Sequence, residues 1–283
     1  MGYVVYSITR SLIDMSVVSA FLVPGSPLPK MQPDSGPWGQ MAQGFQLAGK
    51  ALARSAPDAV VIYSTQWIAV LDQLWQTRPR LRGSHVDENW HEYGDLPFDI
   101  TVDVDLAGAC INGTAAAGLK AKGVDYDQFP VDTGTIVANG FLNTDGKPLV
   151  IASNNVYHDW SATANLGKVA ASAAKLQDKN IAVVAVGGLS GAFFRKTIDP
   201  AADRISSDSD DHWNRRILDL VERGETEELL ELVPDYVSEA KVDMGFKHFA
   251  FVLGALNNQF SGATVHHYGP LYGAGGAVIE FGL

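Results

Sequence analysis

Residues 56–68 read APDAVVIYSTQWI and place an apolar run directly before a polar cluster. The run 60–63, VVIY, has no polar face, which is typical of a parallel strand buried between layers of helices. In open sheets of this kind, ligands bind outside the carboxyl ends of the strands, where Gln66 stands. Glutamine forms hydrogen bonds but is a poor metal ligand and no general base. The stretch predicts an α/β fold with an unusual residue at the expected place for a functional site.

The composition favours one α/β domain that spans residues 1–283. With 46% hydrophobic residues and 28 glycines, the chain can bury a sizeable core and form tight turns. Its net charge of −11 argues against nucleic acid or an anionic membrane as the main partner. The single cysteine, Cys110, excludes an internal disulfide and fits a reducing cytoplasm. Because residues 1–20 lack a signal-peptide pattern and no window could span a membrane, we expect a soluble cytoplasmic protein.

Hydrophobic periodicity predicts a βαβ unit in the first part of the chain. It consists of a buried strand at 17–24, a stiff irregular loop at 25–29, a helix at 36–55 and a strand at 59–63. We then expect a surface loop at 76–94, a half-exposed strand at 98–106 and a helix at 106–122, whereas 129–141 is ambiguous.

The second half predicts a central, mostly parallel sheet flanked by helices. Buried strands are expected at 148–153 and 181–187, with a helix between them at 161–177. One helix then ends at Gly224, a short helix covers 226–232, and a longer helix covers 236–256 after Pro234. Segments 263–268 and 277–281 should form a closing antiparallel hairpin.

Three of these segments should open onto one edge of the sheet: 25–29, 64–67 and 187–191. A mononuclear iron centre at this edge needs chelating side chains, for instance two histidines and a carboxylate. The sequence has Leu28, Gln66 and Gly191 there instead. None of them can hold a divalent metal or act as a base or nucleophile at neutral pH.

The other histidines are weaker candidates. His85, His91 and Glu92 match no zinc or iron spacing, and their polar context favours a solvated surface. His248 lies beside the apolar stripe of its helix. This position favours a histidine that is hydrogen-bonded within the fold over a metal ligand.

Neighbouring strand residues His266 and His267 should point to opposite faces, so packing or surface hydrogen bonding is the expected role of each. Ser190 lies in GLSG, which lacks the pattern of a nucleophile elbow. The glycines at 187–188 form neither a dinucleotide fingerprint nor a P-loop, which argues against phosphate binding.

Several stretches resemble the class III (type II) extradiol ring-cleavage dioxygenases of the protocatechuate 4,5-dioxygenase type. They cover most of the chain: AFLVPGSPLP, PDAVVIYSTQW, VVAVGGLSG, DSDDHWNRRILDLVERG and YGPLYGAGGAVIEF. The resemblance places the iron-ligand histidines of catalytic members at Leu28 and Gln66 and their acid–base histidine at Gly191, so all three positions depart from the family pattern. The third ligand, a glutamate, should fall near residues 239–247, where Glu239 and Asp243 are candidates.

The family includes two-subunit enzymes in which one of two related chains is non-catalytic, and the resemblance is to that chain. It implies a structural or regulatory α subunit without a cofactor or metal of its own. The partner would be a related catalytic β subunit with Fe(II), in an α2β2 heterotetramer that cleaves an aromatic ring with O2. Two alternatives stay open: a self-sufficient metalloenzyme that recruits His85, His91 or His266, and a small-molecule binding module that uses the vacated pocket.

Overall fold

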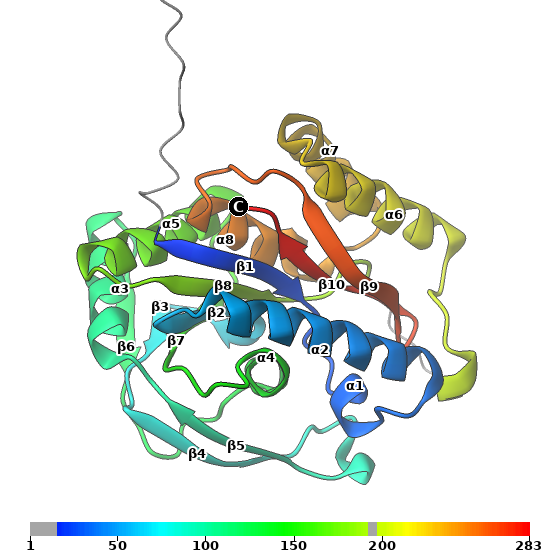
Figure 1. Ribbon diagram of the computed structural model, residues 1–283, viewed down its shortest axis with the longest axis horizontal. Coiled ribbons are helices and arrows are strands. Elements are labelled where there is room, and N and C mark those ends of the chain that lie inside the picture. Colours follow the sequence, from blue (N-terminus) through cyan, green and yellow to red (C-terminus); the bar gives the residue numbers. More distant parts are fainter. Residues whose placement is uncertain (1–15, 192–196) are drawn as a thin grey trace, which may run out of the picture.

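An eight-stranded sheet runs through the centre of the computed structural model, which describes residues 16–191 and 197–283 (Figure 1). Most of the expected N-terminal segment 1–20 therefore lies outside the described residues. From one edge to the other, the strands are β6 (Ala121–Val124), β3 (Gln73–Gln76), β7 (Leu149–Asn155), β2 (Ala59–Ala69), β8 (Ile181–Val186), β1 (Val17–Val23), β10 (Ala274–Phe281) and β9 (Ala263–Leu271).

The middle of this sheet is parallel. Val61 of β2 lies opposite Val150 of β7 on one side and Val183 of β8 on the other, and β8 also pairs in parallel with β1. Strand β10 pairs antiparallel with both β1 and β9, so the predicted C-terminal hairpin forms and extends the main sheet. The predicted α/β class with a mostly parallel sheet is confirmed.

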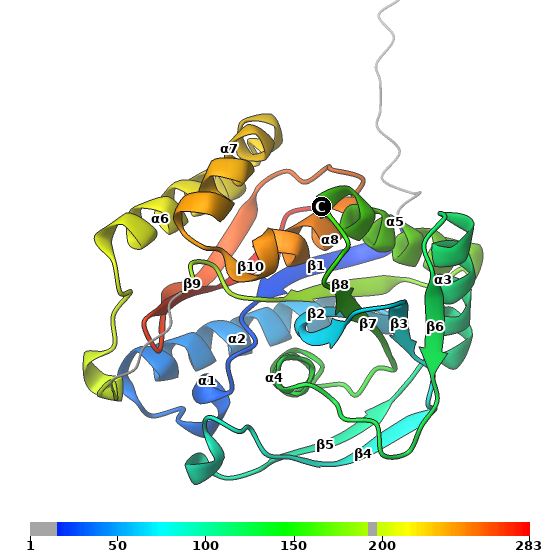
Figure 2. The same ribbon diagram turned by 180° about the vertical axis from the view of Figure 1, so that it is seen from behind.

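Helices cover both faces of the sheet (Figures 1 and 2). One face carries α1 (Leu28–Met31), α2 (Gly36–Ser55), α4 (Thr133–Leu142) and a small sheet of β4 (Arg80–His85) and β5 (Leu96–Thr101). The other face carries α3 (Val104–Ala116), α5 (Trp160–Leu176), α6 (Asp208–Arg223), α7 (Thr226–Glu239) and α8 (Lys247–Ala255). Within the described ranges, no helix is long and apolar enough to cross a membrane.

Each face has its own apolar core. Trp38 and Phe45 of α2 are buried on the first face together with Ile62 of β2. On the second face, Tyr63 of β2 stacks on Phe251 of α8 with ring centroids 4.8 Å apart. Consecutive residues of β2 thus serve opposite cores, as expected of a strand buried on both faces.

Capping side chains determine where several helices begin. Asp132 accepts a hydrogen bond from the N–H of Thr135 and caps α4, so most of the ambiguous segment 129–141 is helical. Asp103 accepts from the N–H of Leu106 in the same way and starts α3 at Val104.

Both ends of α3 differ from the prediction. The strand expected at 98–106 is β5, which ends at Thr101 before the capping aspartate. The helix expected at 106–122 ends at Ala116, and its last residues belong to β6. Alanine-rich composition extended the predicted helix past its true end.

The predicted surface loop at 76–94 is also wrong in part. Strand β4 pairs with β5 along its whole length, and His91–Tyr93 form a 3₁₀ turn. Leu81 is the buried residue of β4 and packs in the core of the α2 face. With one buried side chain in six residues, β4 shows no apolar alternation in its sequence. It is a strand because it pairs with β5.

The boundary between the last two long helices differs from the prediction as well. Helix α7 continues through the exposed Pro234 and ends at Glu239, so the expected helices 226–232 and 236–256 are wrong at their junction. The chain then turns through positive φ at Lys241 and Met244 before α8 begins. The predicted helix ending at Gly224 is confirmed as α6.

Candidate functional site at the strand ends

Strand β2 is irregular where the polar cluster begins. Its pairing with β8 ends at Ser64, and its pairing with β7 breaks after Tyr63 and resumes only at Ile68. The strand therefore continues to Ala69, beyond the predicted end at Tyr63, but residues 65–67 pair with neither neighbouring strand. This bulge lies just past the carboxyl end of β8 and frees polar side chains for contacts outside the sheet.

Gln66 lies between the loop after β1 and the start of α4. A Cβ at Gly25 would lie 2.6 Å from Nε2 of Gln66, and one at Gly134 would lie 3.0 Å from its Oε1. Beside it, the hydroxyl of Ser64 donates to Asp132 Oδ1 at 2.6 Å. The amide of Gln66 thus fits against two glycine positions that leave room for it.

Leu28 lies in the short helix α1, so the predicted irregular loop 25–29 ends in helical structure. Pro29 stands in the first turn of this helix, where its missing N–H costs no hydrogen bond. The side chain of Leu28 is 1% exposed and belongs to the apolar core of the α2 face.

Gly191 is enclosed by the end of α7. Its N–H lies 3.1 Å from the carbonyl oxygens of Ala240 and Lys241, and a Cβ at this position would lie 2.5 Å from the Lys241 oxygen. No side chain can start at Gly191 unless the backbone at Lys241 shifts.

Asp243 is the carboxylate that faces these strand ends. Its Oδ2 accepts hydrogen bonds from Thr65 Oγ1 at 2.7 Å and from the N–H of Gly188 at 3.0 Å. Glu239, the other candidate for the third family position, is exposed at the end of α7. The structure therefore joins Thr65, Gly188 and Asp243, a contact that the sequence could not settle.

His248 is fully buried against Gly187, where a Cβ would lie 2.5 Å from Nδ1 of the imidazole. Neither ring nitrogen makes a hydrogen bond of normal geometry to any described residue, so the expected hydrogen-bonded histidine is wrong. Burial lowers the pKa of His248 to about 4, against the opposing effects of the Asp243 carboxylate and a backbone contact with Gly188. The imidazole is therefore neutral near pH 7.

Two possible nucleophiles are held in structural roles. The hydroxyl of Ser190 accepts hydrogen bonds from Asn214 Nδ2 at 2.8 Å and from the N–H of Gly275 at 3.2 Å. The buried Cys110 has its pKa raised to about 12 by desolvation and by the charge of Asp103, which keeps it a thiol. The expectation that Ser190 has no nucleophilic role fits these contacts.

The remaining predicted histidines do not converge. His91 and Glu92 are exposed, as expected, with side chains 68% and 53% accessible. His266 Nε2 lies 2.8 Å from Glu280, whereas His267 packs against Gly44 of α2.

His85 departs from the expected solvated surface. It is half-buried, and its Nε2 lies 2.8 Å from the hydroxyl of Thr133 at the start of α4. The sequence analysis also missed Asp132. An Asp directly before the first residue of a helix is a common N-cap signal, and here its side chain accepts the N–H of Thr135.

Comparison with known families places most of the chain in one of them. A family model described as the catalytic LigB subunit of aromatic ring-opening dioxygenase matches residues 21–282. The chain belongs to this family.

Two relatives from Pseudomonas sp carry the names of two different subunits of a dioxygenase. The chain is 53% identical over 271 residues to a 2-aminophenol 1,6-dioxygenase alpha subunit, covering 95% of this chain and 100% of that one. It is 26% identical over 287 residues to a 2-aminophenol 1,6-dioxygenase beta subunit, with 94% of each covered. The crystal structure of an uncharacterized protein from Escherichia coli K12 shares the fold with a TM-score of 0.65 at 15% identity, covering 93% of this chain and 99% of that one.

Proposed function

We propose that this chain is the non-catalytic, structural or regulatory α subunit of a two-subunit extradiol dioxygenase. The related β subunit carries Fe(II), and an α2β2 complex opens the ring of 2-aminophenol with O2 to give 2-aminomuconate semialdehyde. The 53% identity to an alpha subunit, against 26% to a beta subunit, supports the assignment to the α type. The single buried thiol, Cys110, supports a cytoplasmic location.

The side chains at the strand ends carry this proposal. Leu28 and Gly191 have no ligand atom, and the amide of Gln66 is a weak donor to iron. Of the two candidates for the third family ligand, Asp243 lies at the strand ends, and its Oδ2 already accepts hydrogen bonds from Thr65 and Gly188. This set does not fit a ferrous centre, so we derive no step of ring cleavage through it.

Exposed apolar side chains near the same edge support a protein partner. Ile68 and Leu71 after the bulge of β2 are 52% and 84% exposed, and Tyr157 after β7 is 79% exposed. The two segments adjoin, because the N–H of Val156 donates to the carbonyl of Ala69 at 2.9 Å. Apolar surface of this kind is typical of a protein interface.

Metal analysis and ring-cleavage assays of the chain, purified alone and together with its partner, test the proposal. We expect neither stoichiometric iron nor ring cleavage from the chain alone, and both from the complex. Stoichiometric iron with ring cleavage by the isolated chain would falsify the proposal.

A pair of substitutions tests the partner surface. Leu71→Asp should weaken copurification of the two subunits, because it places a charge in the apolar surface. Leu176→Asp is the matched control. Leu176 is 86% exposed, but it is the last residue of α5, which leads to the amino end of β8 and not to the carboxyl ends of the strands. Equal weakening by both changes would argue against the surface.

Two alternatives predict different results. If relocated histidines formed an active centre, substitution of His85, His91 or His266 by Ala should abolish ring cleavage, whereas the subunit role predicts little change in ring cleavage by the complex. If the chain is a binding module, titration calorimetry with 2-aminophenol should detect a complex with the isolated subunit.

A further inference from the structure

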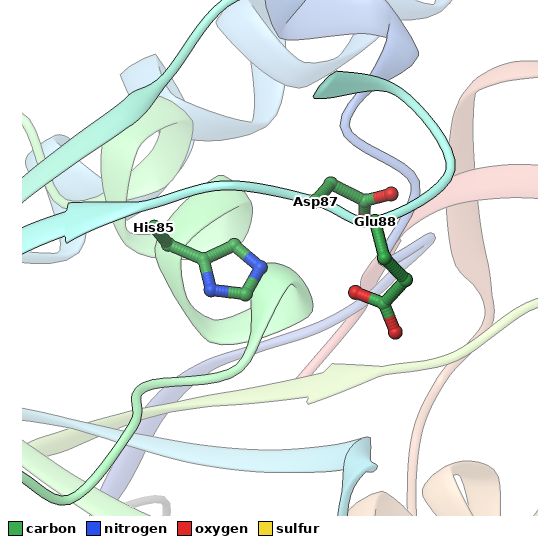
Figure 3. Close-up of side chains that lie close together, drawn as sticks. All are labelled: His85, Asp87 and Glu88. Atoms are coloured by element: carbon green, nitrogen blue, oxygen red, sulfur yellow. The ribbon is translucent and has the colours of Figure 1, made fainter.

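A group of metal-ligating side chains lies outside the strand-end site. In the described ranges, His85, Asp87 and Glu88 each place one ligand atom within 4.8 Å of the others. Figure 3 shows the imidazole of His85 directed towards the carboxylate of Glu88, with Asp87 beside them. His85 ends β4, and the two acidic residues follow in the next turn. One short segment therefore supplies all three groups.

The start of α4 holds this turn in place. Thr133 Oγ1 donates to Asp87 Oδ2 at 3.1 Å and lies 2.8 Å from His85 Nε2. Because the hydroxyl has a single proton, it accepts the N–H of His85 at its lone pair. The N–H of Asn89 donates to the other oxygen of Asp87 at 2.9 Å. The hydroxyl of Thr133 thus holds the imidazole and the carboxylate of Asp87 close together in the absence of a cation.

The charge balance of the group favours a cation. Asp87 is 8% exposed, and neither it nor Glu88 forms an ion pair with a lysine or arginine of the described chain. Buried charges in proteins are usually paired or coordinate a metal. The hydrogen-bond donors to Asp87 are neutral, so this buried carboxylate has no compensating positive charge, and the exposed carboxylate of Glu88 lies beside it.

We propose that His85, Asp87 and Glu88 bind a divalent first-row cation of the Zn²⁺ class. One imidazole and two carboxylates suit Zn²⁺ and leave a coordination position for water. His85 coordinates through Nε2 as the Nδ1–H tautomer and gives up its hydrogen bond to Thr133. The cation fastens the turn after β4 beside α4, whose Gly134 lies against Gln66. Its role is structural support next to the strand ends.

Titration calorimetry of the full-length chain, after treatment with a chelator, tests this site. Zn²⁺ should bind with a stoichiometry of about one and raise Tm by mass action. Mg²⁺ should bind far more weakly, because it prefers oxygen ligands and keeps its waters. Loss of one ligand, in His85→Gln or Glu88→Gln, should lower the affinity for Zn²⁺ at least about tenfold. His85→Gln keeps a side-chain N–H that can donate to Thr133, so we expect this variant to fold.

His91→Gln is the matched control, because His91 is an exposed histidine a few residues further along. Its affinity for Zn²⁺ should equal that of the unchanged chain. No binding of Zn²⁺ by the folded chain, or equal losses in His91→Gln and His85→Gln, would overturn the proposal. These results are separate from the subunit role, which is tested by iron content and ring cleavage.

Discussion

Two neighbouring regions of the molecule divide the properties of a metal site between them. The ends of β1, β2 and β8 have the position that open α/β sheets use, yet Leu28, Gln66 and Gly191 provide no ligand set there. The turn after β4 has an imidazole and two carboxylates, yet it belongs to a small sheet outside the parallel core. The fold determines where a site can lie, and the side chains decide whether chemistry occurs there.

The largest expected effect is a loss of stability in acid, caused by the buried His248 next to the strand ends. An unfolded histidine titrates near pH 6.5, whereas burial lowers the pKa of His248 to about 4. Between these values the unfolded state binds a proton that the folded state does not. The free energy of unfolding should therefore decrease as pH falls from about 6.5 to about 4, by about 3 kcal/mol in total. Urea unfolding at a series of pH values measures this loss.

His248→Gln should flatten this pH dependence, whatever its effect at neutral pH. His91→Gln should leave it unchanged, because His91 is exposed. If His248→Gln keeps the same pH dependence of stability, another group is responsible and the prediction for His248 is wrong.

Gly191→Ala tests how firmly the strand-end region is closed. The new Cβ would lie 2.5 Å from the carbonyl of Lys241, so we expect a loss of about 1–3 kcal/mol in the free energy of unfolding. Gly108→Ala is the matched control, since Gly108 of α3 has open space around it and alanine favours helix by up to about 1 kcal/mol. Similar values for the two variants would contradict a closed site.

Thr133→Val tests the turn after β4. It leaves His85 and Asp87 without their shared partner and should cost about 1–2 kcal/mol, measured by urea unfolding. Added Zn²⁺ should recover part of this loss, because coordination replaces the missing hydrogen bonds. Thr101→Val, at an exposed position of β5, should change little. No recovery with Zn²⁺ would count against the cation site.

Arg80→Gln should have the smallest effect. Arg80 pairs with Asp99 across the β4–β5 sheet through two hydrogen bonds of 2.7 Å, but both side chains are largely exposed. Water and salt screen such a pair, so Tm should fall slightly at low ionic strength and not at high ionic strength. A large decrease would mean that the small sheet depends on this ion pair.

Local patterns predicted the central strands, whereas the functional roles of Leu28, Gln66 and Gly191 in the family came from the resemblance and stay a prediction. Runs such as 60–63 and 181–187 are largely apolar, and β1, β2 and β8, which are parallel, bring the three segments that follow them to the same side of the sheet. Patterns failed where stability comes from a distant partner. Strand β4 has one buried side chain, Leu81, and α7 continues through the exposed Pro234 while Val233 and Tyr236 pack in the core.

The sequence by itself determined which atoms are available at the strand ends, because the identities of Leu28, Gln66 and Gly191 decide what can bind there. Only the tertiary structure decided how that edge is filled. Thr65 and Asp243 are 178 positions apart, and His85 and Thr133 are 48 apart. Such contacts depend on how helices and sheets pack against one another, and no local periodicity records that packing.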